Sequence, residues 1–376
     1  MKIRVERDTL AEAVAWAARI LPQKSQLPIL AGLRLDAESS GALRLSGFDY
    51  EVSAEAELDV MVSEAGSILV PGRLLADISR SLPAGQPVDL ATDGSRVQLS
   101  CGSARFTLPT LPLDEYPSLP SMPEVSGTLG SDAFAAAVGS VAVAAGRDDT
   151  LPVLTGIRVE IDGEDVTLAA TDRYRLAVRT LRWQPVDPSL QATALVPART
   201  LAEAAKSLTA GAEVTLALAA TGTGEGMLGL SGGSRRTTTR LLDGEFPKYR
   251  SLLPDSSSGS ASIDTAALTD AVRRVSLVAS RTSPVRLSFS ADGVVLEAGG
   301  LDEAEAAEAL PASFEGEPLT IAFNPGYLLD GLGAIDSDEA RLSFTGPTKP
   351  AVLTGKASED GGGDYRYLLM PVRLAG

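Results

Sequence analysis

Apolar residues recur at helical spacing in three segments of the chain. These segments are Leu10–Ile20, Phe134–Ala145 and Leu268–Ala279, and all three are rich in Ala and Val. In the first, Leu10, Val14 and Ala17 fall on one face of a helix. Each segment follows a polar residue that can cap a helix, and the candidate caps are Asp8, Asp132 and Asp264. The pattern therefore predicts three amphipathic helices.

A second set of three helices is predicted where a proline-containing hexapeptide recurs. The copies are Val70–Leu75, Val196–Leu201 and Asn324–Leu329, with their prolines 126 and 128 residues apart. Proline is favoured at the first position of a helix, because the N–H that it lacks would have no partner there. We expect each copy to begin a short helix.

Between the helices the apolar pattern changes to period two. Leu33–Leu35, Ile157–Ile161, Val166–Leu168 and Val285–Phe289 alternate apolar and polar residues, as half-buried strands do. Asp-Gly pairs at 93–94, 162–163 and 292–293 precede further strands and are typical of tight hairpin turns. The order helix, strands, helix, strands predicts an α+β domain.

The spacing of the repeated segments predicts three such domains. Tyr116–Pro120, near the end of the first repeat, is echoed by Phe246–Pro254 near the end of the second. A repeat of about 125 residues divides the 376-residue chain into residues 1–124, 125–255 and 256–376.

The composition excludes many kinds of catalytic and metal site. The chain has no histidine and a single cysteine, Cys101, so it has no Ser-His-Asp triad, no imidazole zinc site and no cysteine-rich metal cluster. Gly224–Gly229 fits G-x-G-x-x-G, but the residues after it do not begin the helix that a dinucleotide needs. We expect no catalytic residue, no bound metal and no cofactor.

The charged N-terminus, Met1–Arg7, lacks the apolar core of a signal peptide, and no stretch approaches the length of a membrane span. A lone cysteine suits a reducing compartment. We therefore expect a cytoplasmic protein.

The net charge of −16 is unevenly distributed. Six predicted helix windows, 10–20, 71–83, 132–147, 197–208, 268–281 and 324–335, hold nine basic and six acidic residues, a balance of +3 that leaves −19 for the rest. If the six helices face one way, they form a mildly basic surface opposite an acidic one. The alternative is that Arg and Lys occur there because they favour helices.

Two further segments stand out. In Ala170–Val178 two arginines flank Tyr174 beside a predicted strand, and on physical grounds alone this is a strand with an exposed basic edge. The C-terminal segment Tyr367–Leu374 is apolar for a chain end, which is typical of a strand held in a sheet, although Met370 also suits an adaptable groove.

The order and spacing of five short motifs resemble the beta subunits of bacterial DNA polymerase III, the sliding clamps, over essentially the whole chain. The motifs are Leu27–Leu30, Ala170–Asp172 with Arg175–Ala177, Glu245–Pro247 with Tyr249–Arg250, Ala322–Asn324, and Leu369–Arg373. The high Ala, Gly and Arg content is similar to that of actinobacterial members.

The resemblance implies a ring of six domains, formed by a head-to-tail homodimer with helices inside and sheets outside. In this family the first domain of one chain pairs with the third domain of the other. Phe106, Leu277 and Val278 match the interface positions.

The resemblance also implies a groove between the second and third domains, where clamp-binding peptides of the polymerase, the clamp loader and repair proteins dock. The matching positions are Leu154, Thr171, Arg173, Tyr174, Arg175, Leu176, Pro247, Leu252, Asn324, Tyr327, Met370, Pro371, Val372, Arg373 and Leu374. Without the resemblance, the Leu, Val and Pro members are ordinary core residues. Many relatives have Gly-His where this chain has Arg173-Tyr174, so their peptide preference does not transfer.

Contacts with duplex DNA are expected along the helices. The candidates are Lys24, Arg73, Arg80, Arg147, Arg199, Lys206, Arg273 and Arg274, of which Lys24 and Arg147 match places where relatives touch DNA. These contacts should reach phosphates, because a sliding protein reads no base sequence.

The resulting hypothesis is a cytoplasmic, nucleoid-associated processivity factor that encircles DNA and performs no chemistry. Two alternatives remain open at this point: an enzyme built from three α+β repeats, and a clamp paralogue kept for another purpose, such as tolerance of a clamp-directed inhibitor.

Overall fold

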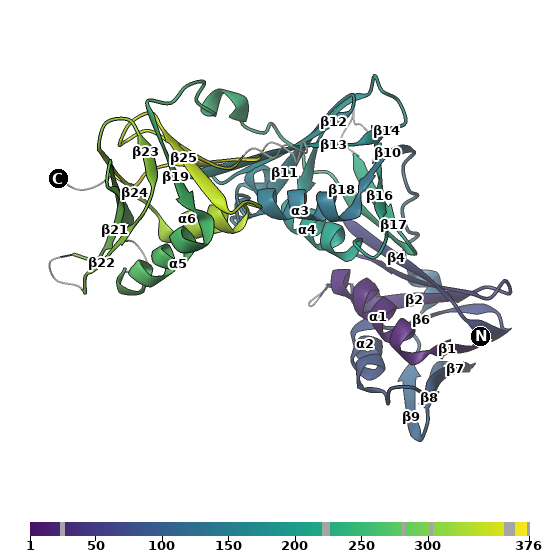
Figure 1. The fold of residues 1–376 in the computed structure, drawn as a ribbon. Helices are drawn as coiled ribbons and strands as arrows, with labels where there is room; N and C mark the ends of the chain where they lie inside the picture. Colours follow the sequence, from purple (N-terminus) through teal and green to yellow (C-terminus); the bar gives the residue numbers. More distant parts are fainter. Residues whose placement is uncertain (23–26, 220–225, 280–282, 301–303, 357–364, 374–376) are drawn as a thin grey trace. The chain divides into compact units, whose positions relative to one another are not determined.

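The computed structural model describes residues 1–22, 27–219, 226–279, 283–300, 304–356 and 365–373. These residues form two compact units (Figure 1). The first contains residues 1–131 and 207–241, and the second contains residues 132–206 and 242–376. Each unit is described by itself.

The first unit contains two antiparallel sheets. One has the order β5-β1-β7-β8-β9, with β1 (Lys2–Glu6), β5 (Met61–Glu64), β7 (Pro87–Asp93), β8 (Arg96–Cys101) and β9 (Ala104–Pro109). The other runs β10-β16-β17-β18-β4-β3-β2-β6. Its strands are β10 (Val125–Gly130), β16 (Glu213–Ala219), β17 (Met227–Gly232), β18 (Arg235–Arg240), β4 (Val52–Asp59), β3 (Ala42–Phe48), β2 (Gly32–Ala37) and β6 (Gly66–Pro71).

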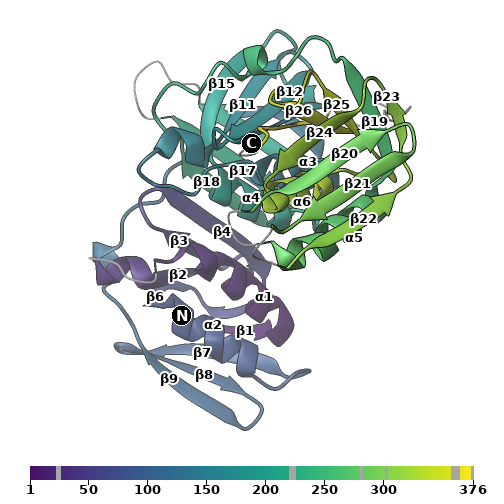
Figure 2. The ribbon, with the colours of Figure 1, turned by 90° about the vertical axis from the view of Figure 1, so that its left-hand side faces the viewer.

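Two helices pack together in the first unit, α1 (Arg7–Ala17) and α2 (Gly72–Ser81) (Figure 2). The core below them is drawn from both helices and both sheets, and includes Leu10, Val14, Leu35 and Leu99. Three short 3₁₀ turns, η1 (Ala18–Ile20), η2 (Pro28–Ala31) and η3 (Leu113–Glu115), complete this part of the chain.

The second unit is built around a nine-stranded antiparallel sheet of order β15-β11-β12-β13-β27-β26-β25-β19-β23. The strands are β11 (Gly156–Asp162), β12 (Asp165–Thr171), β13 (Arg175–Arg182), β15 (Gln191–Pro197), β19 (Gly259–Asp264), β23 (Ser313–Glu315), β25 (Glu339–Phe344), β26 (Ala351–Gly355) and β27 (Tyr365–Leu369). The pairing of β13 with β27, from Arg175↔Leu369 to Arg179↔Tyr365, joins segments about 190 residues apart into one sheet.

A four-stranded sheet and helices complete the second unit. The sheet has the order β22-β21-β20-β24, with β20 (Val285–Ser290), β21 (Gly293–Ala298), β22 (Ala306–Leu310) and β24 (Leu319–Phe323). The helices are α3 (Ser131–Ala142), α4 (Ala198–Ser207), α5 (Thr265–Val275) and α6 (Pro325–Gly333). The short elements are η4 (Pro152–Thr155), η5 (Tyr249–Leu252), η6 (Ser276–Val278) and β14 (Gln184–Pro185). Helices α5 and α6 lie side by side (Figure 1).

All six predicted helices are present. Of the three predicted caps, one is confirmed and two are wrong. Asp264 caps α5, accepting from the Ala267 N–H at 2.7 Å. The prediction of Asp8 as a cap is wrong, because β1 continues to Glu6 and the Glu6 carboxylate caps α1. Asp132 lies inside α3, which begins at Ser131. An acidic residue in the first turn still favours the helix through the helix dipole.

The proline positions are correct for one copy of the repeat and one residue off for the other two. Pro325 is at the start of α6, whereas Pro71 and Pro197 end strands β6 and β15. The strand predictions are confirmed in β2, β11, β12 and β20. Short strands β1, β10 and β19, which the pattern did not predict, precede the first helix of each repeat.

The predicted Asp-Gly turns close hairpins. Gly94 and Gly163 have φ of 57° and 58°, in the left-handed region that favours glycine. The end of the G-x-G-x-x-G motif lies in strand β17, while Gly224 lies outside the described residues. Within the described residues, no helix is long and apolar enough to cross a membrane.

Candidate functional site

The turn between β12 and β13 is built by local hydrogen bonds. Asp172 Oδ1 accepts from the backbone N–H groups of Tyr174 (3.0 Å) and Arg175 (3.1 Å). The Thr171 hydroxyl donates to the Arg175 carbonyl at 2.6 Å. Arg173 has a φ of 79°, which a non-glycine residue rarely adopts. Aspartate stabilises such turns because its carboxylate bonds the backbone two residues ahead. The turn thus presents Arg173 and Tyr174 as exposed side chains at its tip.

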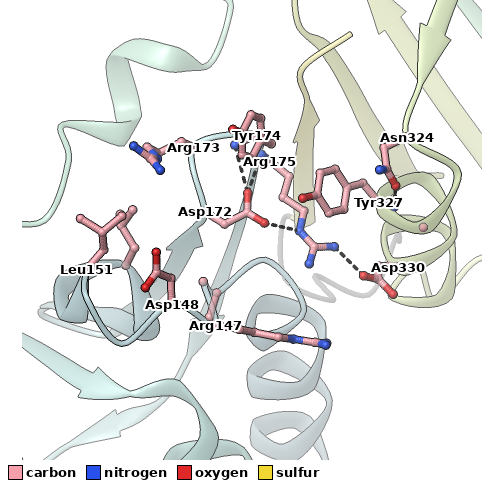
Figure 3. Close-up of a pocket in the computed structure, with 14 residues that line it drawn as sticks. Arg147, Asp148, Leu151, Asp172, Arg173, Tyr174, Arg175, Asn324, Tyr327 and Asp330 are labelled. Atoms are coloured by element: carbon pink, nitrogen blue, oxygen red, sulfur yellow. Dashed lines mark hydrogen bonds and ion pairs between the residues drawn. The ribbon is translucent and has the colours of Figure 1, made fainter. Parts of the chain in front are cut away.

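Arg175, directly after the tip, is buried and joins three elements. Its side chain is 5% exposed and donates to Asp172 Oδ2 at 3.0 Å and to Asp330 Oδ2, on α6, at 2.5 Å (Figure 3). It also donates to the Tyr367 hydroxyl, on β27, at 3.2 Å. The guanidinium lies 4.3 Å from the centroid of the Tyr327 ring, within range for a cation–π contact.

Charge pairing controls the ionisation of this group. Burial alone would lower the pKa of Arg175, but Tyr367, Asp330 and Asp172 outweigh it and raise that pKa. For Tyr367 the effect of burial has the opposite sign: burial raises the pKa of this hydroxyl by more than the charge of Arg175 lowers it. Arg175 is therefore a fixed cation and Tyr367 a neutral hydroxyl at every physiological pH.

A cavity of about 590 Å³ opens beside this cluster. Its walls come from the segment between α3 and β11, from the β12–β13 turn and from α6 (Figure 3). The lining residues are Ala145, Gly146, Arg147, Asp148, Leu151, Leu154, Asp172, Arg173, Tyr174, Arg175, Asn324, Gly326, Tyr327 and Asp330. The rings of Tyr174 and Tyr327 stack, with centroids 6.3 Å apart and planes 24° apart. An aromatic wall with polar groups around it suits an apolar anchor held in one orientation.

The structure brings six of the predicted groove residues to this cavity. They are Leu154, Arg173, Tyr174, Arg175, Asn324 and Tyr327. Asn324 also caps α6, accepting from the Tyr327 N–H at 3.1 Å. Arg147, which was predicted to face DNA, lines the same cavity.

Asp172 and Asp330 are lining residues that the sequence prediction missed. Both accept hydrogen bonds from Arg175. The signal available in the sequence was that a buried arginine requires carboxylate partners. The sequence did not say which carboxylates these are.

The remaining groove candidates lie close to the turn and along the chain end. Met370 donates its N–H to the Tyr174 carbonyl at 2.9 Å, and Val372 donates to the Ala322 carbonyl at 2.8 Å. Thr171 and Leu176 are buried, whereas Leu252 and Met370 are about half exposed. Pro371 is half-buried and Arg373 is exposed. Leu374 lies outside the described residues.

Pro247 lines a second cavity, of about 440 Å³, beside the segment that follows β18. Its walls include Arg158, Glu160, Tyr249 and Arg250. Glu160 accepts from Arg158 at 2.5 Å, from the Tyr249 hydroxyl at 2.8 Å and from Arg250. Burial raises the pKa of Glu160. The three donors lower this pKa by more than burial raises it, so the net shift is downward.

Most of the predicted DNA-facing residues already have partners on the surface. Arg80, Arg199 and Arg273 pair with an acid on their own helix, at 3.7, 3.1 and 3.2 Å. Arg274 makes two bonds to Glu308, at 2.6 and 3.0 Å. Arg73 donates to the Leu21 carbonyl at 2.5 Å. Lys206 is exposed, and Lys24 lies outside the described residues. These pairings reduce the positive potential of the helices.

The predicted interface residues lie at two different edges. Phe106 is on β9, which ends one sheet of the first unit. Leu277, on η6 after α5, is 84% exposed, and Val278 beside it is half-buried.

Comparison with known proteins matches the whole chain to one family. Models of the DNA polymerase III beta subunit match residues 1–120 (N-terminal domain), 128–248 (central domain) and 250–373 (C-terminal domain). The prediction of three α+β clamp domains in one chain is therefore confirmed.

Individual relatives agree with the family models. The chain is 58% identical to the beta sliding clamp of Streptomyces coelicolor and 48% identical to the beta sliding clamp homolog GriR of Streptomyces muensis, each over 100% of both chains. It is similar in structure to a sliding clamp of Pseudomonas aeruginosa bound to griselimycin, with a TM-score of 0.91, 27% identity and full coverage of both chains. The chain belongs to the family of DNA polymerase III beta subunits, the beta sliding clamps, which are processivity factors and not catalysts.

Proposed function

We propose that two copies of this chain close head to tail into a ring that encircles duplex DNA and tethers the polymerase. The full-length match to beta sliding clamps carries this proposal. Three domains in each chain, with boundaries at 1–124, 125–255 and 256–376, supply the six domains of the ring. The ring works in the cytoplasm, associated with the nucleoid.

Two unpaired strand edges support the head-to-tail arrangement. Among the described strands, β9 pairs only with β8, and β22 pairs only with β21. An exposed edge invites pairing with another chain. Exposed Arg96 and Arg105 lie on β8 and β9, whereas exposed Glu305 immediately precedes β22. Opposite charges favour pairing of β9 of one chain with β22 of the other, and two such contacts close a dimer.

Contacts with DNA are to phosphates and are individually weak. The helix arginines are largely offset by neighbouring acids, as in Arg199 with Glu203. A protein held on DNA by its topology does not need many ion pairs, and fewer ion pairs allow it to slide. Sequence-independent sliding follows from contacts that avoid base edges.

The ring is tested by its retention on DNA. Once loaded onto nicked circular DNA, the clamp should stay bound through gel filtration at moderate salt, and at least 80% should dissociate within minutes after the circle is cut (about a fivefold loss). Light scattering should give twice the chain mass. Equal retention on circular and linear DNA contradicts a topological link, and a monomer at micromolar concentration contradicts the ring.

We propose that the cavity at the β12–β13 turn and the residues beside it form the groove for clamp-binding peptides. Met370 is about half exposed and offers apolar surface beside Tyr174, whose ring stacks on Tyr327. Leu176 is buried in the core cluster that includes Phe246 and Leu368 and supports the turn from below. A few buried apolar anchors generally dominate the affinity of such a site.

Leu176→Ala combined with Met370→Ala should weaken the binding of a polymerase tail peptide by at least about tenfold, measured by fluorescence anisotropy. The dimer should persist, because neither residue lies on β9 or β22. Val186→Ala removes an apolar side chain that is 70% exposed and lies outside the cavity, and it is the matched control. Unchanged affinity in the double variant removes this site assignment.

The identities favour the replicative clamp over a paralogue kept for another purpose. The chain is 58% identical to the Streptomyces coelicolor clamp and 48% identical to the homolog GriR. Loss of viability on depletion of the protein tests this choice.

A further inference from the structure

Arg173 adopts a backbone conformation that is unfavourable for arginine. Among the described residues, it and Tyr50 are the two non-glycine residues with positive φ, at 79° and 76°. Such a conformation is strained for a residue with a side chain, and strained backbone concentrates at functional sites. Glycine would avoid this strain, so the side chain of Arg173 invites a functional explanation.

The two residues at the turn tip extend to opposite sides of the cavity. Tyr174 lies next to Tyr327, whereas Arg173 lies on the side of Leu151 and Asp148 (Figure 3). Both side chains are exposed, and Tyr174 is 56% exposed. The cavity thus has an aromatic wall on one side and a cation on the other.

Each carboxylate of the cavity already receives donors from the protein. Asp172 and Asp330 accept from Arg175. Asp148 accepts from the Thr150 hydroxyl at 2.7 Å and the Thr150 N–H at 3.0 Å. The pKa of Asp148 is lowered mainly by these hydrogen bonds, and less by the charge of Arg173.

The three arginines of the cavity differ in how far they are hydrogen-bonded to other residues of the protein. Arg175 is fully engaged with Asp172, Asp330 and Tyr367. The side chains of Arg173 and Arg147 make no hydrogen bond or ion pair with any residue that the structure describes. The cavity therefore offers guanidinium donors to an incoming group, while Asp172 accepts hydrogen bonds at both carboxylate oxygens and Asp148 and Asp330 at one oxygen each.

We infer that Arg173 selects peptides that carry an acidic side chain close to the apolar anchor that meets Tyr174 and Tyr327. This inference rests on the proposed peptide-binding function of the groove. A carboxylate at this position would receive a charge-assisted hydrogen bond from a guanidinium that makes no hydrogen bond or ion pair with a described residue and acts on Asp148 only through its charge. A basic side chain there would face a free cation, so the groove discriminates by repulsion as well as by attraction.

The test compares matched peptides on matched variants of the full-length clamp. The probes are fluorescent copies of the clamp-binding tail of the polymerase, made in pairs that carry Asp or Asn at one position. Each position flanking the apolar anchor is changed in turn. Arg173→Gln removes the charge and keeps the length, and Arg173→Gly also removes the backbone strain. Arg182→Gln, an exposed arginine outside the cavity, controls for general electrostatics.

We expect the wild-type clamp to prefer Asp over Asn by about fivefold at one position in low salt, as for a partly exposed charge pair. Arg173→Gln should abolish this preference and bind the Asn peptide as the wild type does, whereas Arg182→Gln should retain the preference. Raising the salt concentration should reduce the preference of the wild type for Asp over Asn. It should have no such effect on Arg173→Gln or Arg173→Gly, which lack the charge.

Three results would overturn the inference. If the wild type binds both members of every pair equally, the groove does not select an acid, although it still binds peptides. If Arg173→Gly tightens all peptides equally, Arg173 only obstructs the cavity. If no peptide binds any variant, the peptide-binding function itself fails, and the inference fails with it.

Discussion

Two hairpin turns, one in each compact unit, have the same backbone and different surroundings. In both, an aspartate Oδ1 accepts from the backbone N–H groups two and three residues ahead. Asp49 accepts from Glu51 and Val52. Asp172 accepts from Tyr174 and Arg175. In both, the next residue has a positive φ, at Tyr50 and at Arg173. The two turns occupy corresponding positions in their repeats.

The neighbouring strands bind the two turns in the same way. The Arg240 N–H donates to the Glu51 carbonyl at 2.9 Å, and the Met370 N–H donates to the Tyr174 carbonyl at 2.9 Å. Position 52 is valine, however, where position 175 is arginine. Tyr50, at the position of Arg173, lies against Phe48 in its own hairpin. Exposed Glu51 is at the position of Tyr174, which reaches Tyr327 on α6. The repeat thus fixes the backbone of the turn, and the side chains of Arg173, Tyr174 and Arg175 make one copy the wall of a cavity.

The largest difference between the turns should appear when position 175 is changed. Arg175→Met leaves the carboxylates of Asp172 and Asp330 without their cation, and breaking such a buried pair costs about 3 kcal/mol. Val52→Met, at the corresponding position, should cost less than about 1 kcal/mol. Urea unfolding followed by circular dichroism measures both. Similar losses in the two variants would show that the arginine cluster adds no stability specific to the second turn.

A smaller difference should appear below neutral pH, in the segments beside the two turns. Arg158 and Glu160 on β11 correspond to Arg34 and Asp36 on β2, but Glu160 also accepts from Tyr249. Since its donors hold the pKa of Glu160 below the ordinary value of 4.5, the ionised group stabilises the fold at pH above 4.5. This stability is lost as the pH falls through the lowered pKa of the folded state.

Glu160→Gln should therefore remove at most about 1 kcal/mol at pH 7, because charges near the surface are screened, and progressively less as the pH falls below 4.5 through the lowered pKa of Glu160. Unfolding free energies measured between pH 7 and pH 3 give the two curves. Asp36→Asn is the matched change in the other repeat and should cost less stability at pH 7, because no tyrosine among the described residues donates to Asp36. A greater effect of Asp36→Asn would contradict the role of the tyrosine donor.

The smallest effect concerns the shared backbone. Arg173→Gly and Tyr50→Gly should each stabilise the protein by about 0.5 kcal/mol, because glycine relieves the positive φ but loses more chain entropy on folding. Thermal unfolding of both variants checks this. If only one variant is stabilised, the two turns do not store equal strain, and the equivalence of their backbones is incomplete.

The helices and most strands follow from local patterns, because burial of one face requires a fixed period of apolar residues. Asp264 is identifiable as a cap from its type and position. The cap at Glu6 was missed, because the short strand β1 before the helix has too few residues to show its period. The same limit applies to β10 and β19.

For the candidate site, the resemblance supplied Tyr174, Arg175 and Tyr327, but not the carboxylates that hold Arg175. Asp330 lies 155 residues from Arg175 and resembles any other acid on an exposed helix face. Arg147 was predicted to face DNA from its helix window and from the resemblance, and its position in the lining of the cavity was not predicted. Pairings at this separation in sequence have no local signature, because they depend on how sheets and helices pack.

The sequence by itself determined the threefold repeat, the α+β class and the absence of histidine chemistry, since these depend on composition and on short-range periodicity. Only the tertiary structure decided which copy of a repeated turn lines a cavity. That choice depends on β27 and α6 meeting the second turn, where a buried guanidinium finds two carboxylates and a ring. Desolvation makes such a group stable only when all its partners are in place, and that condition is set by packing between distant segments.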